Sequence, residues 1–449
     1  MGQNEMKTMT ELADARDFRR LKEWLAQMQE ADIAEFMEEV TGEKAVVVFR
    51  MLPKELATDV FAFLPAAKQQ EIIDRITDAE LQAVIEDLFV DDAVDMLEEF
   101  PANVVKRVLK NAKPDTREMI NLFLQYPANS AGSIMTAEYL ALKKDMTVEE
   151  AFAYIRLHGV DKETIYTCYV TDQRRKLEGV VTVKDLLMNP YEVRLEEIMD
   201  SHVIKSVTTE DQEQVAEKFT RYDLLSLPVV DGENRLVGIV TVDDVVDVME
   251  QEATEDFEKM AAMVPSERPY LQTSVFLLAK NRIMWLLILM LSSMITGGIL
   301  ARYENAFALI PLLVTFIPML TDTGGNAGSQ SSTLIIRGMA VGEIEPGDVF
   351  RVLWKELRVG MIVGGILGLV NYVQLVLRFP GNEQICLTVV LSLFATVLLA
   401  KTVGSVLPMA ARMLRLDPAI MAAPLITTIV DAFSLVIYFK IACRLLELA

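Results

Sequence analysis

The feature that most constrains this chain is an uncharged run near its end that a single carboxylate interrupts. The run extends from Ala419 to Phe439, and Asp431 is its one charged residue. About twenty apolar residues suffice for a helix to cross a bilayer. A carboxylate at that depth costs roughly 2.5–3.5 kcal/mol on insertion scales, so it is usually paired, protonated or in contact with water. The run therefore predicts a membrane-spanning helix that lines an ion path.

Charge is divided unevenly along the chain. The 449 residues carry a net charge of −22, from 43 basic and 65 acidic residues. Residues 275–449 hold 13 of the basic and 10 of the acidic ones, which leaves 30 and 55, a net charge of −25, for residues 1–274. We therefore expect an acidic soluble half joined to an apolar membrane half. An acidic surface attracts cations and repels nucleic acid, so nucleic acid is not an expected partner.

The soluble half is expected to lie in the cytoplasm, because roughly the first thirty residues lack the apolar core of a secretory signal. The three cysteines are far apart and the two histidines form no cluster. Neither a disulfide framework nor a thiolate or imidazole metal site is therefore predicted. Since no catalytic triad, phosphate-binding loop or transferase motif is present either, we expect no enzymatic activity.

Residues 1–128 have the pattern of an all-helical domain. Apolar residues recur at helical spacing from about Asp14 to Phe123, and the prolines suit first turns and linkers. A segment that begins at Leu52-Pro53 is echoed 48 residues later at Phe100-Pro101. Such an echo predicts helical hairpins that stack into a short superhelix.

A clearer repeat, offset by 59 residues, follows in the soluble half. Gly179 to Asp185 (Gly-Val-Val-Thr-Val-Lys-Asp) matches Gly238 to Asp244 (Gly-Ile-Val-Thr-Val-Asp-Asp). Together with the preceding segments, the repeat predicts two tandem β-α-β-β-α units, 129–191 and 192–250. They resemble paired cystathionine-β-synthase (CBS) domains, which dimerise and commonly sense adenine nucleotides. ATP is therefore a candidate ligand, although the threonines of the motif also serve simply as helix caps.

Beyond an acidic connecting helix (251–274), a transmembrane domain of five helices is predicted for 275–449. Its apolar segments are long enough to cross a bilayer with some tilt: Ile283–Leu300, Phe307–Ser332, Gly360–Leu377, Ile385–Ala411 and Ala419–Ile441. Basic residues gather in the loops on the side of the soluble half, which by the positive-inside rule places the N-terminus inside and the C-terminus outside. Lys401 either pairs with a carboxylate or snorkels toward an interface.

A second polar stretch lies within the second apolar segment. Asp322, Asn326 and Gln330 recur every four residues and therefore share one helical face. The glycines between them suit close helix packing, so a pore lining and a packing surface are both open. Thr427 and Asp431 share a face in the same way. Oxygen ligands of this kind favour Mg²⁺, Ca²⁺ or Mn²⁺, and two copies of Asp431 on a twofold axis would balance a divalent charge, which favours a homodimer.

At these residues the sequence resembles the MgtE family of magnesium channels. The resemblance rests on the stretch from Asp322 to Gly338, on Asp417-Pro-Ala, and on Pro424-Leu-Ile-Thr-Thr-Ile-Val-Asp431, and it covers nearly the whole chain. It implies a homodimeric Mg²⁺-selective channel in the plasma membrane. Its ion site would be built around Asp431, with contributions from the other predicted pore residues, Thr427, Thr428, Asp322 and Asn326. Ala423 stands where some relatives carry asparagine, so the filter differs there.

The resemblance also implies a cytosolic sensor, in which Mg²⁺ binds carboxylates between the N-terminal domain, the CBS pair and the connecting "plug" helix and closes the pore. Such binding would give negative feedback on uptake, because an ion that binds the closed form more tightly shifts the population toward it. The positions that match this sensor are Asp91, Asp95, Asp211, Glu213, Asp223, Asp244, Asp247, Glu252, Glu255, Asp256 and Asp417.

Two other functions remain open at this point. A secondary transporter would use Asp431 to couple divalent-cation movement to H⁺ or Na⁺. A membrane-tethered nucleotide receptor would use the CBS pair, but it leaves Asp431 and the polar stretch around Asp322 without a role. The chain is therefore interpreted as a multidomain membrane protein whose transported and regulatory ion is Mg²⁺.

Overall fold

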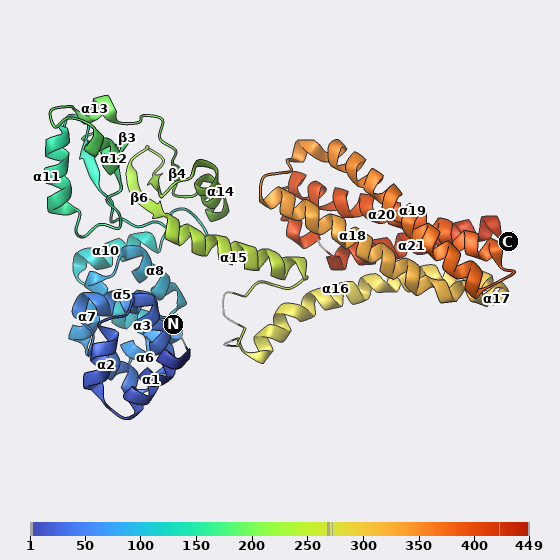
Figure 1. The fold of residues 1–449 in the computed structure, drawn as a ribbon, viewed down its shortest axis with the longest axis horizontal. Coiled ribbons are helices and arrows are strands. Elements are labelled where there is room, and N and C mark those ends of the chain that lie inside the picture. Colours follow the sequence, from blue (N-terminus) through green and yellow to red (C-terminus); the bar gives the residue numbers. More distant parts are fainter. Residues whose placement is uncertain (1–2, 267–269, 272, 422, 448–449) are drawn as a thin grey trace. The chain divides into compact units, whose positions relative to one another are not determined.

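The computed structural model describes residues 3–266, 270–271, 273–421 and 423–447 (Figure 1). The chain divides into two compact units, Met1–Met249 and Glu250–Ala449. Both ends of the chain, positions 267–269 and 272 of the predicted connecting segment, and position 422 of the last apolar run lie outside the described residues.

The first unit begins with a succession of short helices, as the apolar spacing predicts. Prolines immediately precede α5, α6 and α9 and open α10, where a fixed φ and a missing N–H cost nothing. The helices are α1 (Gln3–Asp14), α2 (Phe18–Leu25), α3 (Glu30–Glu39), α4 (Glu43–Phe49), α5 (Lys54–Ala62), α6 (Ala66–Ile73), α7 (Asp78–Asp87), α8 (Val90–Glu99), α9 (Ala102–Asn111) and α10 (Pro114–Phe123).

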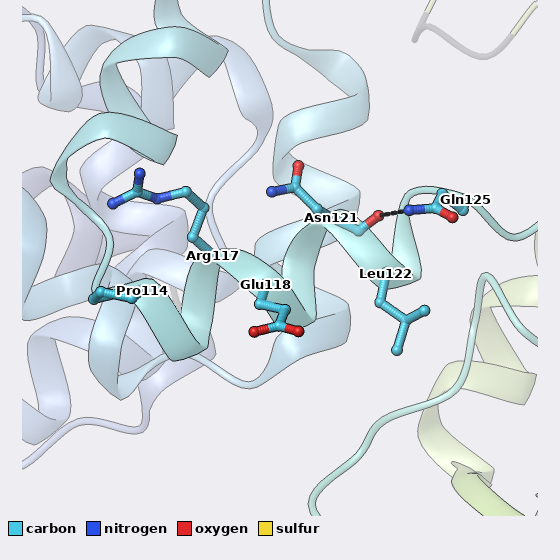
Figure 2. A pocket seen from close by; sticks show the side chains of 6 residues that line it. All are labelled: Pro114, Arg117, Glu118, Asn121, Leu122 and Gln125. Carbon is cyan, nitrogen blue, oxygen red and sulfur yellow. Dashed lines mark hydrogen bonds between the residues drawn. The ribbon is translucent and has the colours of Figure 1, made fainter.

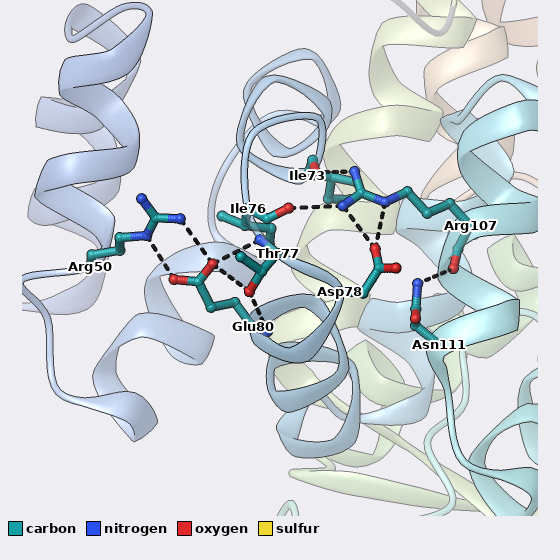
Figure 3. A network of polar contacts seen from close by, with 8 residues as sticks. All are labelled: Arg50, Ile73, Ile76, Thr77, Asp78, Glu80, Arg107 and Asn111. Atoms are coloured by element: carbon teal, nitrogen blue, oxygen red, sulfur yellow. Dashed lines mark hydrogen bonds and ion pairs between the residues drawn. The ribbon is translucent and has the colours of Figure 1, made fainter.

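Polar side-chain contacts tie these helices to one another (Figure 3). Arg107 of α9 donates to the carbonyl oxygens of Ile73 and Ile76, at 2.5 and 2.8 Å, and so satisfies the C-terminal end of α6. Arg50 donates to both carboxylate oxygens of Glu80, at 2.7 and 2.9 Å. That hydrogen bond, with the capping box that Glu80 forms at the start of α7, lowers the pKa of Glu80 to about 2.

Two similar α/β units complete the first unit, each with a three-stranded sheet in sequence order. In both, the first strand is parallel and the third antiparallel to the middle strand. The first contains β1 (Ala141–Lys143), α11 (Val148–His158), β2 (Thr167–Thr171), β3 (Leu177–Thr182) and α12 (Val183–Met188). A short α13 (Leu195–Ile198) leads to the second, with β4 (Ser206–Val207), α14 (Gln212–Tyr222), β5 (Ser226–Val230), β6 (Leu236–Thr241) and α15 (Val242–Met260). The predicted tandem β-α-β-β-α order is confirmed.

The signature threonines act as helix caps. Thr182 forms a capping box with Asp185 at the start of α12, and the Thr241 hydroxyl donates to Asp244 at 2.6 Å. One hydrophobic core joins the N-terminal helices to the second α/β unit, through side chains such as Val215, Leu227 and Val245. The start of α15 is thereby fixed against the N-terminal helices.

Helix α15 spans the predicted boundary at 250/251 between the second α/β unit and the connecting helix. It runs without a break from Val242 to Met260 and passes from the first unit into the second. The apolar side chains near its start are buried in the core of the first unit. The acidic residues that follow belong to the same continuous helix. The plug residues are therefore a direct extension of the last CBS helix.

The second unit consists of long helices: α16 (Val275–Arg302), α17 (Glu304–Leu309), η1 (Pro311–Phe316), α18 (Ile317–Ala340), η2 (Pro346–Asp348), α19 (Val349–Arg378), α20 (Glu383–Met413), η3 (Pro418–Met421) and α21 (Ala423–Leu445). Among the described residues, the segments of α16, α19, α20 and α21 are long and apolar enough to cross a membrane. No side chain of α16 is buried within this unit, as expected of a helix that faces lipid or another chain.

The second apolar segment is the one that the sequence describes least well. Phe307–Ser332 was expected to be a single interrupted span, but the backbone forms α17, η1 and α18 in succession. Pro311 and Pro318 each lie in the first turn of a new helical segment, where proline is favoured. Helix α18 then continues to Ala340, and it is not among the four apolar spans because of its polar residues.

Candidate functional site

Helix α18 has two distinct faces. The side chains of Asp322, Asn326 and Gln330 are exposed along one of them, whereas Gly324 and Gly328 are buried along another. The four-residue spacing places the three polar side chains in one line. A polar lining and a close-packed surface, the two alternatives left open by the sequence, thus describe different faces of one helix.

The glycines bring α18 very close to α20 and α21. A Cβ atom at Gly325 would lie 2.9 Å from Cγ2 of Thr427. One at Gly328 would lie 2.7 Å from Cγ2 of Ile426 and 3.2 Å from the carbonyl oxygen of Ala400. A side chain larger than hydrogen does not fit at either place, so the glycines set the contact between the polar motifs of α18 and α21.

Helix α21 presents hydroxyl and carboxylate oxygens one turn apart. Thr427 and Thr428 both donate to the carbonyl oxygen of Pro424, at 2.9 and 3.0 Å. A hydroxyl that donates its proton in this way keeps its oxygen lone pairs available for a cation. Asp431 follows one turn after Thr427, and its side chain is only partly buried. Pro424 therefore orients both threonines near the carboxylate.

The carboxylates of Asp322 and Asp431 are close enough to repel each other. Within the described part of the chain, neither forms a hydrogen bond or an ion pair. Two like charges in apolar surroundings are unfavourable unless a cation or a proton neutralises them. The predicted pore residues thus lie on two adjoining helices, where they would stabilise a cation.

Lys401, the basic residue within α20, is buried and packs beside Gly360 of α19. Among the described residues it forms no ion pair, and it does not reach the surface of the unit. The nearest buried carboxylate along that face of α19 is Glu356, which accepts a 2.6 Å hydrogen bond from Ser331 of α18. Of the two alternatives expected for Lys401, pairing with a carboxylate is not found among the described residues, and snorkelling stays a prediction.

A first cluster of predicted sensor residues lies where α8, the start of α15 and the first CBS unit meet. Three predicted residues, Asp91, Asp95 and Asp244, interact there with carboxylates that were not predicted. We call this group the junction cluster; it contains Asp91, Asp92, Asp95, Glu138, Glu163, Asp243 and Asp244. Asp247 lies one turn further along α15 and acts electrostatically on Asp244.

The junction cluster carries more negative charge than its surroundings neutralise. Desolvation, followed by neighbouring carboxylates, raises the pKa of Asp92 to about 6 and those of Asp95 and Glu163 to about 7. Burial also raises the pKa of Asp244 to about 6, against the lowering effect of its Thr241 hydrogen bond. The Oδ1 atom of Asp91 is buried without a hydrogen-bond partner. These oxygens suit a divalent cation.

The predicted residues Asp211, Glu213 and Asp223 lie around α14 but do not converge. Asp211 caps the start of the helix by accepting from the backbone N–H of Glu213 at 2.9 Å. Asp223 stands at its other end with φ 50°, roughly 18 Å away by helix geometry. No single cation can bind all three across that distance, so among the described residues these positions form no common site.

The third group lies at the end of α15, in the second unit. Lys259 forms ion pairs with Glu255, one turn earlier, and with Asp417 of the loop before η3, the latter at 2.7 Å. Asp256 is partly buried beside them, and burial, then the charge of Asp417, raise its pKa. Glu252 lies one turn before this group. Met260 packs against Ile336 and Ala419, which anchors the helix end.

Some members of these sites were not predicted from the sequence. Asp92 and Asp243 are immediate neighbours of predicted residues, so paired aspartates could have indicated them. Glu163 reaches the junction cluster from a loop of the first CBS unit, a tertiary contact that no motif marks. Lys259 is a base among predicted carboxylates, and its residue type alone gives no indication of a cation site. Among the described residues, no three His, Cys, Asp or Glu side chains form a ready-made metal cage.

A shallow surface pocket of about 520 Å³ lies along α10 (Figure 2). None of the predicted site residues lines it. Its lining consists of Pro114, Arg117, Glu118, Asn121, Leu122 and Gln125.

Comparison with known families covers most of the chain. The MgtE family model, described as a divalent cation transporter, matches residues 317–441. The MgtE intracellular N domain matches residues 28–129, and the CBS domain matches 131–191 and 195–251.

Relatives of nearly the same length are known. A magnesium transporter MgtE from Thermus thermophilus is 38% identical over 96% of this chain and 96% of its own, and one from Bacillus subtilis is 31% identical over 95% and 93%. Among solved structures, the cytosolic domain of the Mg²⁺ channel MgtE in complex with ATP is 38% identical, with a TM-score of 0.51 over 54% of this chain and 99% of that one. The soluble part of a magnesium transporter gives 25% identity and a TM-score of 0.53, over 56% and 99%.

Proposed function

The chain belongs to the MgtE family of magnesium transporters, and we propose that it is a homodimeric, Mg²⁺-selective channel that cytosolic Mg²⁺ closes. The family's transported ion is Mg²⁺. The observation that carries the proposal is the pair of neighbouring carboxylates of Asp322 and Asp431, which lie on adjoining helices and form no hydrogen bond or ion pair among the described residues. An expensive charge is retained at membrane depth when it serves an ion path.

In this proposal, Asp431 is the main charged ligand of the pore. Thr427 and Thr428 add hydroxyl oxygens, and Asp322 and Asn326 extend the polar path along α18. Mg²⁺ gives up its water reluctantly, so these oxygens hold a mostly hydrated ion. A fifth span, formed by α18, crosses the membrane shielded by α20 and α21, with its polar face turned to water or to a second chain.

Dimerisation follows from charge and from exposed apolar surface. One Asp431 per chain leaves a divalent ion half neutralised, whereas two on a twofold axis balance it. In the first unit, Leu157, Leu187 and Met188 of α11 and α12 are largely exposed, as expected of an interaction surface. A second chain would also supply ligands near Asp211 and Asp223, which lie apart within one chain.

Gating uses the sensor carboxylates. We call Glu252, Glu255, Asp256 and Asp417 the plug carboxylates. Mg²⁺ that binds them and the junction cluster offsets the repulsion between carboxylates and stabilises a closed arrangement. Release of Mg²⁺ loosens that arrangement. The proposed sensor residues are Asp91, Asp95, Asp211, Glu213, Asp223, Asp244, Asp247, Glu252, Glu255, Asp256 and Asp417. The protein lies in the plasma membrane with its N-terminal domains in the cytoplasm and its C-terminus outside, as the basic loops support.

ATP is proposed to bind the CBS pair, on the strength of the relative solved with ATP. Its binding would modulate the Mg²⁺ concentration at which the pore closes, because both ligands act on the same domains. Isothermal titration of the full chain with ATP, with and without Mg²⁺, tests this part. A lack of heat under both conditions would remove ATP from the account.

Ion flux into proteoliposomes and currents in planar bilayers test the transport mechanism. We expect Mg²⁺ currents well above the turnover of a carrier, and no dependence on a H⁺ or Na⁺ gradient. Uptake that requires such a gradient would instead favour the coupled transporter. Protease protection of the soluble half as Mg²⁺ is raised to millimolar levels tests the sensor, and its absence would contradict gating by Mg²⁺.

A further inference from the structure

A lysine ammonium occupies the middle of the plug carboxylates. Lys259 Nζ lies 2.7 Å from Asp417 Oδ2 and also forms an ion pair with Glu255. Its side chain retains only 23% of its exposure, against 31% for Asp417 and 32% for Glu255. Burial by itself lowers the pKa of Lys259, but the hydrogen bonds to Asp417 and Glu255 outweigh it and raise the pKa overall. The group is therefore charged at any physiological pH.

The second oxygen of Asp417 also has a partner. Asp417 Oδ1 accepts from the backbone N–H of Ala419 at 2.8 Å, which holds the carboxylate in place at the start of η3. Asp256 adds a third carboxylate, and Arg337 acts on it from α18. Three acidic and two basic side chains thus meet here. The carboxylates fit a hard divalent cation, and the Lys259 ammonium already stands between two of them.

We propose that Lys259 is a tethered competitor of Mg²⁺ at the plug carboxylates and sets the cytosolic Mg²⁺ concentration at which this site fills. This inference rests on the proposed sensor. For Mg²⁺ to bind Glu255 and Asp417 together, the ammonium must leave both. The sensor therefore responds at a higher Mg²⁺ concentration than the same carboxylates would without the lysine.

The reverse role, a latch that holds the plug without Mg²⁺, predicts the opposite change. If Lys259 competes with Mg²⁺, removing its ammonium lets Mg²⁺ bind more tightly. If Lys259 is a latch, removing its ammonium loosens the plug. The sign of the shift in Mg²⁺ response therefore separates the two roles.

The test measures protease protection of the full-length protein against Mg²⁺ concentration, for wild type, Lys259→Met, Lys259→Arg and Lys280→Met. Methionine keeps the length of the side chain and removes its charge, and arginine keeps the charge. Lys280 is an exposed lysine of the same unit outside the plug group, so it serves as the control. Melting of each variant without Mg²⁺ shows whether it is folded, and Mg²⁺ uptake gives a second readout.

We expect Lys259→Met to shift the protection midpoint to a Mg²⁺ concentration roughly three- to tenfold lower, because two partly exposed ion pairs each correspond to a few-fold change in an equilibrium constant. Lys259→Arg and Lys280→Met should keep the wild-type midpoint. An unchanged or higher midpoint in a folded Lys259→Met protein overturns the inference. If wild type itself shows no protection at any Mg²⁺ concentration, the proposed sensor fails instead.

Discussion

Glu356 illustrates how single residues hold the membrane half together. Its carboxylate is buried on α19 and accepts a 2.6 Å hydrogen bond from Ser331 of α18. A buried charge that loses its donor costs about 1–3 kcal/mol or more, since no water replaces the bond. The contact thus fixes α18, which carries Asp322 and Asn326, against the rest of the bundle.

Ser331→Ala is therefore expected to lower the free energy of unfolding by about 1–3 kcal/mol. A second change, Glu356→Gln, should restore part of that loss, because a neutral amide is less costly to bury than a carboxylate. Chemical denaturation of the purified protein in detergent measures both. If Ser331→Ala is as stable as wild type, the hydrogen bond does not position α18.

Some of the important residues could be predicted from the sequence and others could not. Asp431 stood out because an apolar run makes a carboxylate conspicuous, and Asp322 and Asn326 followed from their spacing. Glu356 and Lys259 did not stand out. Each depends on a partner distant in the sequence, Ser331 and Asp417, and one chain's pattern of residue types carries no record of such a contact.

The packing of the helices in the second unit depends on the contact of α18 with α20 and α21. Gly328 lies where a Cβ atom would come within 2.7 Å of Ile426 and 3.2 Å of a backbone oxygen of α20. Backbone cannot move aside as a flexible side chain does. By contrast, nothing lies within 4 Å of a Cβ atom at Gly365 of α19.

Gly328→Ala should consequently cost about 1–3 kcal/mol through overpacking and reduce Mg²⁺ uptake, because Thr427 and Asp431 shift away from α18. Gly365→Ala is the matched control, and it should be neutral or up to about 1 kcal/mol stabilising, as alanine favours helix. Unfolding midpoints in detergent and uptake by proteoliposomes compare the two. Equal behaviour of the variants would show that close packing of α18 is unimportant.

Elements with strong periodicity or repetition were predictable. The tandem β-α-β-β-α order and the all-helical N-terminal region are confirmed because each recurs with its own turn and cap residues. The second apolar segment was wrong in detail, since prolines that break a span look the same in sequence as prolines that kink one. The boundary between CBS pair and plug at 250/251 stays a prediction, and the helix is continuous across it because no residue there stops a helix.

The soluble half contains many carboxylates that no basic residue neutralises. The junction cluster assembles them from three parts of the chain, and Asp95 and Glu163 reach a pKa of about 7. The unfolded values are about 4. Between these limits the folded state binds more protons than the unfolded state, so the stability contributed by those protons is present near pH 4 and is lost as pH rises through 7.

Without divalent ions, the full-length protein should therefore unfold at a higher temperature at pH 5.5 than at pH 7.5, to the extent that the cluster controls its stability. Mg²⁺ should raise the unfolding temperature more at pH 7.5, where protons no longer compete. Differential scanning fluorimetry measures this dependence. In the Asp92→Asn, Asp95→Asn double variant both effects should shrink, and an unchanged difference between the two pH values would exclude the cluster as their cause.

Asp431 remains the most direct test of the whole account. The decisive measurement is the initial rate of Mg²⁺ uptake into proteoliposomes that contain the full chain or its Asp431→Asn variant, at equal protein density. Glu383→Gln, which removes an exposed carboxylate at the start of α20 away from the polar faces, is the control. We expect Asp431→Asn to lose nearly all Mg²⁺ uptake and Glu383→Gln to keep the wild-type rate. Wild-type uptake by a correctly folded Asp431→Asn protein would contradict the claim that this carboxylate forms the ion site.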